Sequence, residues 1–301
     1  MSKMSVNLAG VTLKNPVMTA SGTFGSGAEY SEFVDLNNLG AVVTKGVANV
    51  PWPGNPTPRV AETTGGMLNA IGLQNPGIDV FCERDIPFLK KYDTKIIVNV
   101  CGHAPEEYLA VVERLADEPI DMMEINISCP NVNAGFLAFG QDAKHVEELT
   151  AQIKKIAKQP IIMKLTPNVT DITEIAKAAE AGGADALSLI NTLTGMKIDI
   201  NRRTFAVANK TGGVSGPVVH PIAVRMVYQT AQAVNIPIIG MGGIATPEDA
   251  IEMILAGASA VSVGTANFYN PNATIEIIDG IEAYMKKNGF ESVKDMVGIV
   301  K

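Results

Sequence analysis

Cysteine and histidine are scarce in this sequence, and their scarcity limits the metal chemistry that the chain can support by itself. The 301 residues include three cysteines and three histidines, namely Cys82, Cys101, Cys129, His103, His145 and His220. Because these residues are dispersed, they match no zinc or iron–sulfur spacing, and a metal site would require long-range convergence. We therefore expect no metal site and interpret the cysteines as free thiols in a reducing compartment.

Long hydrophobic runs, basic runs and a positive net charge are also absent. No stretch approaches 18 uninterrupted apolar residues, so no transmembrane helix is predicted. The N-terminal residues MSKMSVNLAG lack the apolar core of a signal peptide. The net charge of −7 argues against nucleic acid or an anionic membrane surface as the main partner. A cytoplasmic location is the default expectation.

Short apolar runs recur along the chain with the composition of buried strands. Eight of them lie at residues 16–21, 41–47, 95–101, 121–128, 160–166, 186–192, 237–242 and 260–265. Most are apolar on both faces, as parallel strands buried on both sides must be. Residues 5–13 additionally predict a small hairpin that turns at Ala9 and Gly10.

Amphipathic helix patterns separate these runs, for example at residues 104–118, 142–158 and 171–181. Thr246 and Pro247 begin another helix, since threonine is a good N-cap and proline suits the first helical position. Eight β-then-α units in about 250 residues are the arithmetic of a (β/α)8 TIM barrel. We therefore predict the α/β class and one domain spanning residues 1–301. A doubly wound sheet is the structural alternative, although it seldom needs eight units.

Two connections are longer than plain barrel loops, at residues 48–75 and 193–219. Loops of this length without elements of their own are usually lids or binding segments. Both leave from the carboxyl ends of strands, where barrel active sites are built. We expect them to lie over the carboxyl face.

Polar residues fall late in the apolar runs, and they recur from strand to strand. A polar side chain in a buried strand costs free energy unless it is satisfied, so a recurring set indicates a shared polar ligand on the barrel axis. Lys45 and Lys164 are the sharpest signals, because a buried ammonium group needs a partner. Two lysines facing a phosphate-bearing ligand suggest a ring that gains negative charge, and a reduced flavin fits.

Glycines mark the ends of the last two strand-like runs, in Gly242-Gly243 and Gly264-Thr265. Barrels commonly bind a phosphate at this place, through backbone N–H groups and a helix N-terminus. The alternative is that these glycines serve only as tight turns.

Cys129 follows the fourth strand-like run, which must end at Pro130 because proline cannot donate to a sheet ladder. A thiol at a strand carboxyl end, beside Asn126 and Asn131, is a candidate base or nucleophile. The alternative is a small buried apolar cysteine.

Ten segments together carry a family resemblance. They are TASGTFG (19–25), TKGV (44–47), NAIGLQNPG (69–77), VNVCG (98–102), EINISCPN (124–131), MKLTPN (163–168), INT (190–192), GGVSGP (212–217), GMGGI (240–244) and VGTANF (263–268). In this order they resemble dihydroorotate dehydrogenase of class 1 over essentially the full length of the chain. The resemblance implies oxidation of (S)-dihydroorotate to orotate in de novo pyrimidine (UMP) biosynthesis, with FMN as the first electron acceptor.

The resemblance also implies roles for individual residues. Those that would hold FMN are Ser21, Lys45, Gly46, Asn99, Asn126, Lys164, Ile190, Gly216, Gly242, Gly243, Gly264 and Thr265. Those that would hold dihydroorotate are Lys45, Asn69, Ala70, Ile71, Gly72, Leu73, Asn126, Asn191 and Thr192. Cys129 would be the catalytic base, whereas the membrane-bound, quinone-reducing class has a serine at that position.

Two segments, at residues 54–77 and 138–142, are similar to class 1B within the family. Class 1B implies NAD+ as the final acceptor and a homodimer of this chain that docks a partner subunit carrying FAD and a [2Fe–2S] cluster. The resulting assembly would be a heterotetramer. The close alternative is class 1A, a homodimer that uses fumarate. Two further readings are a flavin barrel acting on another dihydropyrimidine and a non-catalytic phosphate-binding barrel or scaffold.

Overall fold

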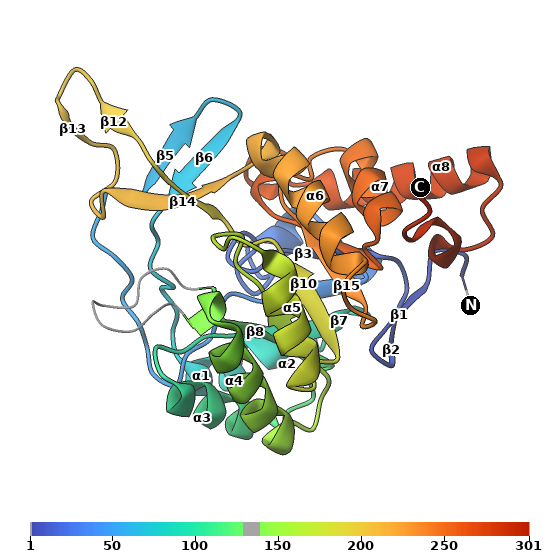
Figure 1. Cartoon of the computed structure of the whole chain (residues 1–301), viewed down its shortest axis with the longest axis horizontal. Coiled ribbons are helices and arrows are strands. Elements are labelled where there is room, and N and C mark those ends of the chain that lie inside the picture. The colour runs from blue at the N-terminus through green and yellow to red at the C-terminus, as the bar shows by residue number, and fades with distance from the viewer. Residues whose placement is uncertain (1, 129–138, 301) are drawn as a thin grey trace.

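The centre of the fold is a closed barrel of eight parallel strands, which confirms the predicted (β/α)8 class (Figure 1). The computed structural model describes residues 2–128 and 139–300. The barrel strands are β3 (Val17–Thr19), β4 (Ala41–Val43), β7 (Lys95–Val100), β8 (Met122–Asn126), β9 (Ile161–Lys164), β10 (Ala186–Leu189), β15 (Ile238–Met241) and β16 (Ala260–Val263). Each lies inside the range that its apolar run predicted, and their order around the barrel follows the chain.

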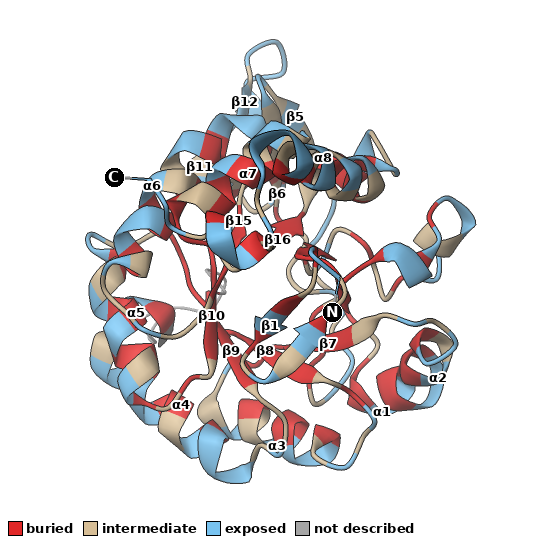
Figure 2. Ribbon diagram, turned by 90° about the vertical axis from the view of Figure 1, so that its right-hand side faces the viewer, coloured by how far each residue is buried: buried red, intermediate tan, exposed pale blue. Residues whose placement is uncertain are grey.

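Helices form a ring outside the strands, and the strands are the buried layer (Figure 2). The longer helices are α3 (Pro105–Leu115), α4 (Ala143–Ile156), α5 (Ile172–Ala181), α6 (His220–Ala231), α7 (Pro247–Ala256) and α8 (Ala273–Asn288). The connection after β4 ends in α1 (Ile78–Val80), the π-helical turn η3 (Phe81–Asp85) and α2 (Ile86–Leu89). The 3-10 turns in the second half of the chain are η4 (Phe139–Gln141), η5 (Pro217–Val219), η6 (Thr265–Phe268) and η7 (Val293–Met296).

The first β-then-α unit differs from the expectation. Between β3 and β4 the chain forms only the 3-10 turns η1 (Tyr30–Glu32) and η2 (Leu36–Asn38) in place of an α-helix. Gly22, Gly25 and Gly27 in this connection all have positive φ angles, of 83°, 55° and 91°. Because a right-handed helix needs negative φ, these residues interrupt helical backbone.

The start of α7 confirms the predicted helix signal. The Thr246 hydroxyl accepts a hydrogen bond from the Asp249 N–H, and the Asp249 carboxylate accepts one from the Thr246 N–H at 2.8 Å. This reciprocal capping box satisfies two donors that the first helical turn would leave unpaired. It sets the point at which the chain turns from the loop after β15 into the outer layer.

The predicted N-terminal hairpin is also present, as β1 (Val6–Leu8) and β2 (Val11–Leu13). Ala9 and Gly10, which form its turn, have φ angles of 50° and 89°. Two consecutive positive φ angles belong to a type I′ turn, whose twist suits a two-residue hairpin.

The two long connections form an antiparallel sheet of their own, which the sequence did not predict. Its strands are β5 (Val60–Thr63), β6 (Gly66–Asn69), β11 (Leu193–Met196) and β14 (Thr211–Ser215), in the order β11-β14-β6-β5. β14 pairs with β6, so the two connections cross over the same side of the barrel (Figure 1). A side chain at Gly212 would meet the Asn69 carbonyl oxygen at 2.6 Å, so glycine permits this close pairing.

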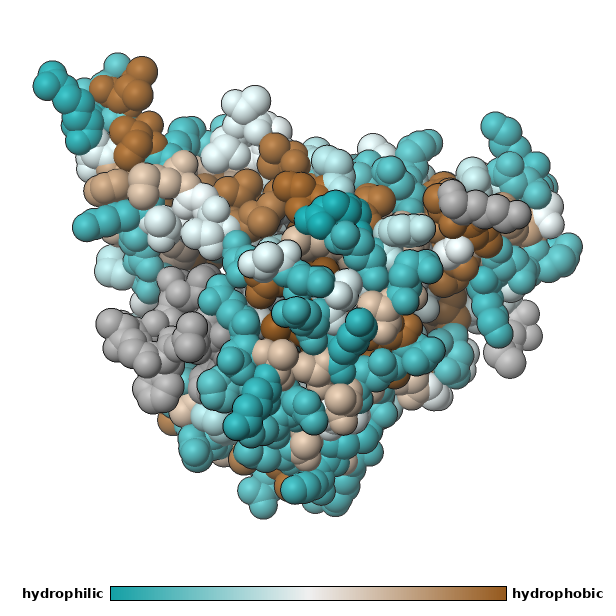
Figure 3. All heavy atoms as spheres, viewed as in Figure 1, coloured by the Kyte–Doolittle hydropathy of each residue, from teal (hydrophilic) through white to brown (hydrophobic). Residues whose placement is uncertain are grey.

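A small hairpin of β12 (Ile198–Asp199) and β13 (Thr204–Phe205) projects from this sheet (Figure 1). Apolar side chains gather at its tip, at one edge of the face that Figure 3 shows. Ile198, Ile200 and Phe205 are exposed, Ile200 to 81%. Within the described residues, no helix is long and apolar enough to cross a membrane.

Candidate active site

A cavity of about 1040 Å³ is lined by residues from the carboxyl ends of the barrel strands and from the sheet formed by the long connections. Its volume is at the upper end of the usual range for ligand sites, which is roughly 300–1,000 Å³. The predicted cofactor residues on its wall are Ser21, Lys45, Gly46, Asn126, Lys164, Ile190, Gly216, Gly242, Gly243, Gly264 and Thr265. The predicted substrate residues on its wall, besides Lys45 and Asn126, are Asn69, Ala70, Ile71, Gly72, Leu73, Asn191 and Thr192.

Two of the predicted site residues are not among those that form the described cavity wall. Asn99 lies deeper, fully buried on β7, where its amide nitrogen donates to Glu124 Oε1 at 2.6 Å. Cys129, the predicted base, lies outside the described residues. The last described residue before it is Ser128, which itself lines the cavity.

One side of the cavity, which we call the side-chain wall, consists of Lys45, Asn126, Lys164 and Asn191. Lys164 ends β9 with 5% of its side chain exposed, and its ammonium group donates to Ser21 Oγ at 3.1 Å. Lys45 follows β4, and its backbone N–H donates to the Gly25 carbonyl at 2.8 Å. The wall therefore presents two cations, from strands that β7 and β8 separate in the barrel.

The amides of the side-chain wall are linked to each other. Asn126 Oδ1 accepts from Ser128 Oγ at 2.7 Å and from Asn191 Nδ2 at 3.4 Å, and Asn191 also donates to Ser128 Oγ. The Thr192 N–H donates to Asn191 Oδ1 at 2.7 Å. These bonds join the end of β8 to the end of β10 and hold the amide groups in one orientation.

A second group of lining residues, which we call the glycine wall, consists of Gly216, Gly242, Gly243 and Gly264. The first three have φ angles of 102°, 128° and 70°, which side chains rarely tolerate. An added Cβ at Gly243 would lie 2.7 Å from the Cβ of His220 and 2.9 Å from the Gly216 carbonyl oxygen. The wall therefore offers bare backbone beside the N-terminus of α6, a suitable place for an anion.

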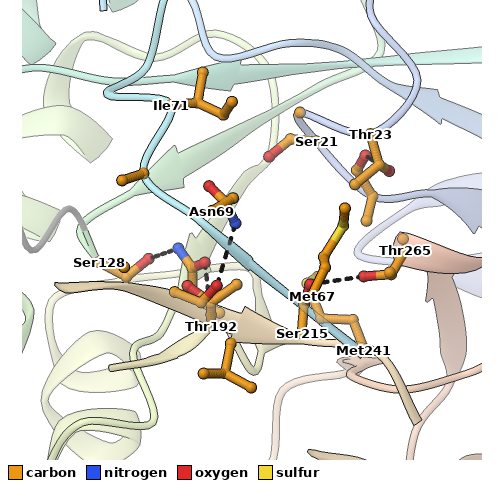
Figure 4. Close-up of a pocket in the computed structure, with 18 of the residues that line it drawn as sticks. Ser21, Thr23, Met67, Asn69, Ile71, Ser128, Thr192, Ser215, Met241 and Thr265 are labelled. Carbon is orange, nitrogen blue, oxygen red and sulfur yellow. Dashed lines mark hydrogen bonds between the residues drawn. The ribbon is translucent and has the colours of Figure 1, made fainter. Parts of the chain in front are cut away.

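Hydroxyl groups complete the rim of the glycine wall. Thr265 Oγ1 donates to Ser215 Oγ at 2.8 Å, which joins the end of the eighth barrel strand to β14. Figure 4 shows this pair on one side of the pocket and Ser128 with Thr192 on the other. The hydroxyls beside the glycine wall and those at the ends of β8 and β10 thus line one cavity.

His220 supports the glycine wall, a role that the sequence did not suggest. Its Nδ1 lies 2.9 Å from the Gly242 carbonyl oxygen, and its Nε2 lies 3.1 Å from Glu252 Oε2 of α7. The ring therefore links the Gly242 peptide to two helices. Histidine was noted in the sequence only for its dispersion, and nothing local marks this contact.

Glu124 is the second residue that sequence reasoning missed. It is 1% exposed inside the barrel and contacts Asn99, Ser188 and Lys164. A signal was present, because Glu124 is a charged residue in an apolar run, two positions before Asn126. That spacing places both side chains on the same strand face.

A (β/α)8 barrel with two lysines and bare glycine backbone around a cavity at the strand carboxyl ends is typical of barrel enzymes that bind phosphate-bearing ligands at that end. Residues 3–285 match the model of the dihydroorotate dehydrogenase family. The chain belongs to that family.

Several curated relatives are similar to this chain over nearly all of their length. The dihydroorotate dehydrogenase B (NAD(+)) catalytic subunit of Lachnoclostridium phytofermentans is 70% identical over 297 residues, which cover 99% of both chains. The protein of the same description from Alkaliphilus metalliredigens is 65% identical over 295 residues, 98% of both chains. That from Thermoanaerobacter pseudethanolicus is 53% identical over 298 residues, 99% of both chains.

Proposed function

We propose that this chain is the FMN-carrying catalytic subunit of a dihydroorotate dehydrogenase that oxidises (S)-dihydroorotate to orotate in pyrimidine (UMP) biosynthesis. The observation that carries the proposal is the convergence of lysines, amides and bare glycine backbone on one cavity. The relatives named dihydroorotate dehydrogenase B (NAD(+)), catalytic subunit support the same assignment. We propose that residues 1–301 act as one FMN-binding domain.

The residues around the cavity fit FMN. Asn99 Oδ1 is buried and has no hydrogen-bond partner among the described residues, so it calls for a donor from a ligand. The imide N–H of a flavin ring is such a donor. A Cβ at Gly46, which lines the cavity, would crowd this oxygen at 2.9 Å, so glycine lets the oxygen lie close to the cavity wall. The glycine wall suits the phosphate of the same cofactor.

In this proposal FMN is held by both walls. The side-chain wall and Ser21 would contact the ring, and the glycine wall with Thr265 would bind the phosphate. When bound, FMN supplies the hydride-accepting ring, and the protein supplies binding, orientation and charge. Gly46, Asn99 and Ile190 would complete the ring site, as the family resemblance implies.

The substrate would lie against the amides of the side-chain wall. Dihydroorotate carries a carboxylate and two ring amide groups, and Asn69, Asn126 and Asn191 offer amide donors and acceptors to them. The ammonium group of Lys45 suits the carboxylate. Residues 70–73 and Thr192 would enclose the substrate. Fixing the substrate in one orientation determines which of its faces meets the base.

Cys129 would be that base. Its thiolate would remove the proton from C5 of dihydroorotate. A free cysteine titrates near ~8.5, so part of the thiol would be ionised near neutral pH. The proposal rests on its position in the chain, directly after Ser128 and the end of β8.

A second subunit would pass the electrons on. The words "catalytic subunit" and "NAD(+)" in the relatives' names support a partner and NAD+ as the final acceptor. We propose that the partner is an iron–sulfur flavoprotein with FAD and a [2Fe–2S] cluster, which a homodimer of this chain docks to form a heterotetramer.

An acceptor assay tests this function. The isolated chain should reduce an artificial dye with dihydroorotate and be nearly inert with NAD+, and adding the partner should restore NAD+ reduction. Efficient fumarate reduction without any effect of a partner would contradict the NAD+ assignment and favour the class 1A activity. Faster turnover of dihydrouracil than of dihydroorotate would contradict the substrate.

A further inference from the structure

Glu124 is a buried carboxylate on β8, in the interior of the barrel beneath the cavity. Only 1% of its side chain is exposed. Burial of a carboxylate costs free energy unless hydrogen bonds and an opposite charge satisfy it. The contacts of Glu124 therefore have to offset the cost of burying its carboxylate.

Three barrel strands supply those contacts. Glu124 Oε1 accepts from Asn99 Nδ2 of β7 at 2.6 Å, and Oε2 accepts from Ser188 Oγ of β10 at 2.8 Å. Lys164 Nζ of β9 lies 3.8 Å from Oε1, with 5% of the lysine side chain exposed. Glu124 is thus the common partner of two residues predicted to hold the cofactor.

The first consequence concerns the orientation of Asn99. A carboxylate only accepts hydrogen bonds, so the amide nitrogen of Asn99 has to face Glu124. The amide oxygen then points elsewhere, and it is this buried atom that has no partner among the described residues. Glu124 therefore determines that Asn99 presents an acceptor, rather than a donor, toward Gly46, which lines the cavity.

The second consequence concerns charge. Lys164 and Glu124 are both almost completely shielded from water, where a charge acts more strongly than at the surface. The anion lies below the cation, and the cation lines the cavity. The positive potential that a ligand experiences is therefore the difference between the two charges.

We propose that Glu124 is a positioning residue for the cofactor: it orients the amide of Asn99 and offsets part of the charge of Lys164, which together set the reduction potential of bound FMN. This inference rests on the proposed function, in which FMN occupies the cavity. Glu124 itself acts through Asn99 and Lys164.

Glu124→Gln tests the charge. Glutamine has nearly the same shape, and its amide oxygen can still accept from Asn99. Without the negative charge, Lys164 attracts the electron-rich reduced ring more strongly. We expect the variant to bind reduced FMN about tenfold more tightly relative to oxidised FMN, which for a two-electron couple raises the midpoint potential by about 30 mV. Anaerobic spectroelectrochemistry of the FMN-loaded protein measures this shift.

Ser188→Ala is the matched control. It removes one hydrogen bond from the same carboxylate but leaves the charge in place. We expect a lower melting temperature of the apoprotein and an unchanged midpoint potential. A rise as large as that of Glu124→Gln would show that loosening the cluster suffices, and it would overturn the role assigned to charge.

The double variant Glu124→Gln/Lys164→Met removes both charges, so the rise seen in the single variant should disappear. The orientation of Asn99 is tested by Glu124→Leu, which offers no acceptor and should weaken binding of oxidised FMN about tenfold in fluorescence titration. Apoprotein melting curves identify variants that do not fold.

An unchanged or lower midpoint potential in Glu124→Gln, or an unchanged FMN affinity in a folded Glu124→Leu, would overturn the inference. Failure of the unmodified chain to bind FMN would instead contradict the proposed function, so the two failures are distinguishable.

Discussion

The two walls of the cavity use different chemistry to hold a ligand. The side-chain wall offers ammonium and amide groups from buried strands, and its members are linked by hydrogen bonds between side chains. The glycine wall offers only backbone, in conformations that side chains rarely adopt. The comparison teaches that one site can combine functional groups supplied by side chains with backbone that is exposed because a side chain is absent. Substitutions on the first wall should alter reactivity, whereas those on the second should alter cofactor affinity.

The largest effect should come from Cys129, three positions after Asn126 of the side-chain wall. In Cys129→Ala, dihydroorotate should reduce the bound flavin ~10²–10⁴-fold more slowly, because a general base typically contributes that much. The FMN content should not change, since the thiol is not needed for cofactor binding. Cys129→Ser should keep a little activity, shifted to higher pH. Stopped-flow reduction at the unmodified rate in Cys129→Ala would rule out the base.

The glycine wall should respond in affinity instead. Gly243→Ala would place a Cβ 2.7 Å from that of His220 at a φ of 70°, so the backbone must shift. We expect FMN to bind at least tenfold more weakly in fluorescence titration, with the reduction rate of the loaded enzyme less affected. Gly289→Ala is the matched control, because Gly289 has a φ of 74° and nothing within 4 Å of the added atom. Equal losses of affinity in both variants would mean that strain, not crowding at the site, is responsible.

Lys164→Ala should show a smaller loss that combines both kinds of effect. The flavin should bind more weakly, and its midpoint potential should fall because a cation beside the reduced ring is lost. Lys95→Ala is the control, since Lys95 begins barrel strand β7 and pairs with Asp121 at 2.9 Å. If Lys164→Ala kept its FMN content and potential, the lysine would be a structural residue only.

The last effect concerns stability rather than the ligand and lies away from both walls, at the thiol of Cys82 in η3. Burial, and next the nearby charge of Glu118, raise the pKa of Cys82 from 9.0 to about 11. The fold disfavours the thiolate, so the contribution of this thiol to stability is complete below pH 9 and is lost as the pH rises through about 11. The loss should be on the order of 2 kcal/mol. Urea unfolding between these pH values should show a shallower decline in Cys82→Ala, and parallel curves would contradict the assignment.

The barrel could be predicted from the sequence because each of its strands lies in a short apolar run that can be recognised from neighbouring residues alone. An apolar run such as 160–166 is buried on both faces, and the charged residue within it, Lys164, stands out against its neighbours. The same logic located most of the side-chain wall. It should also have singled out Glu124, which has the same pattern within β8.

The sheet formed by the long connections could not be predicted in the same way. β6 and β14 are short strands that contain glycine, and they pair although they lie far apart in the sequence. A pattern of neighbouring residues cannot reveal such a pairing. Alternation within one strand does not say which distant strand will lie beside it. His220 was missed for the same reason, since its partners Gly242 and Glu252 meet it only in the folded barrel.

Anaerobic mixing of the purified chain with dihydroorotate tests the central claim most directly. The protein should be yellow, with a flavin band near ~450 nm that belongs to the cofactor. Dihydroorotate alone should bleach this band, because the proposed function places the substrate beside the ring. A colourless protein, or a flavin band that dihydroorotate leaves unchanged, would contradict the assignment of this cavity.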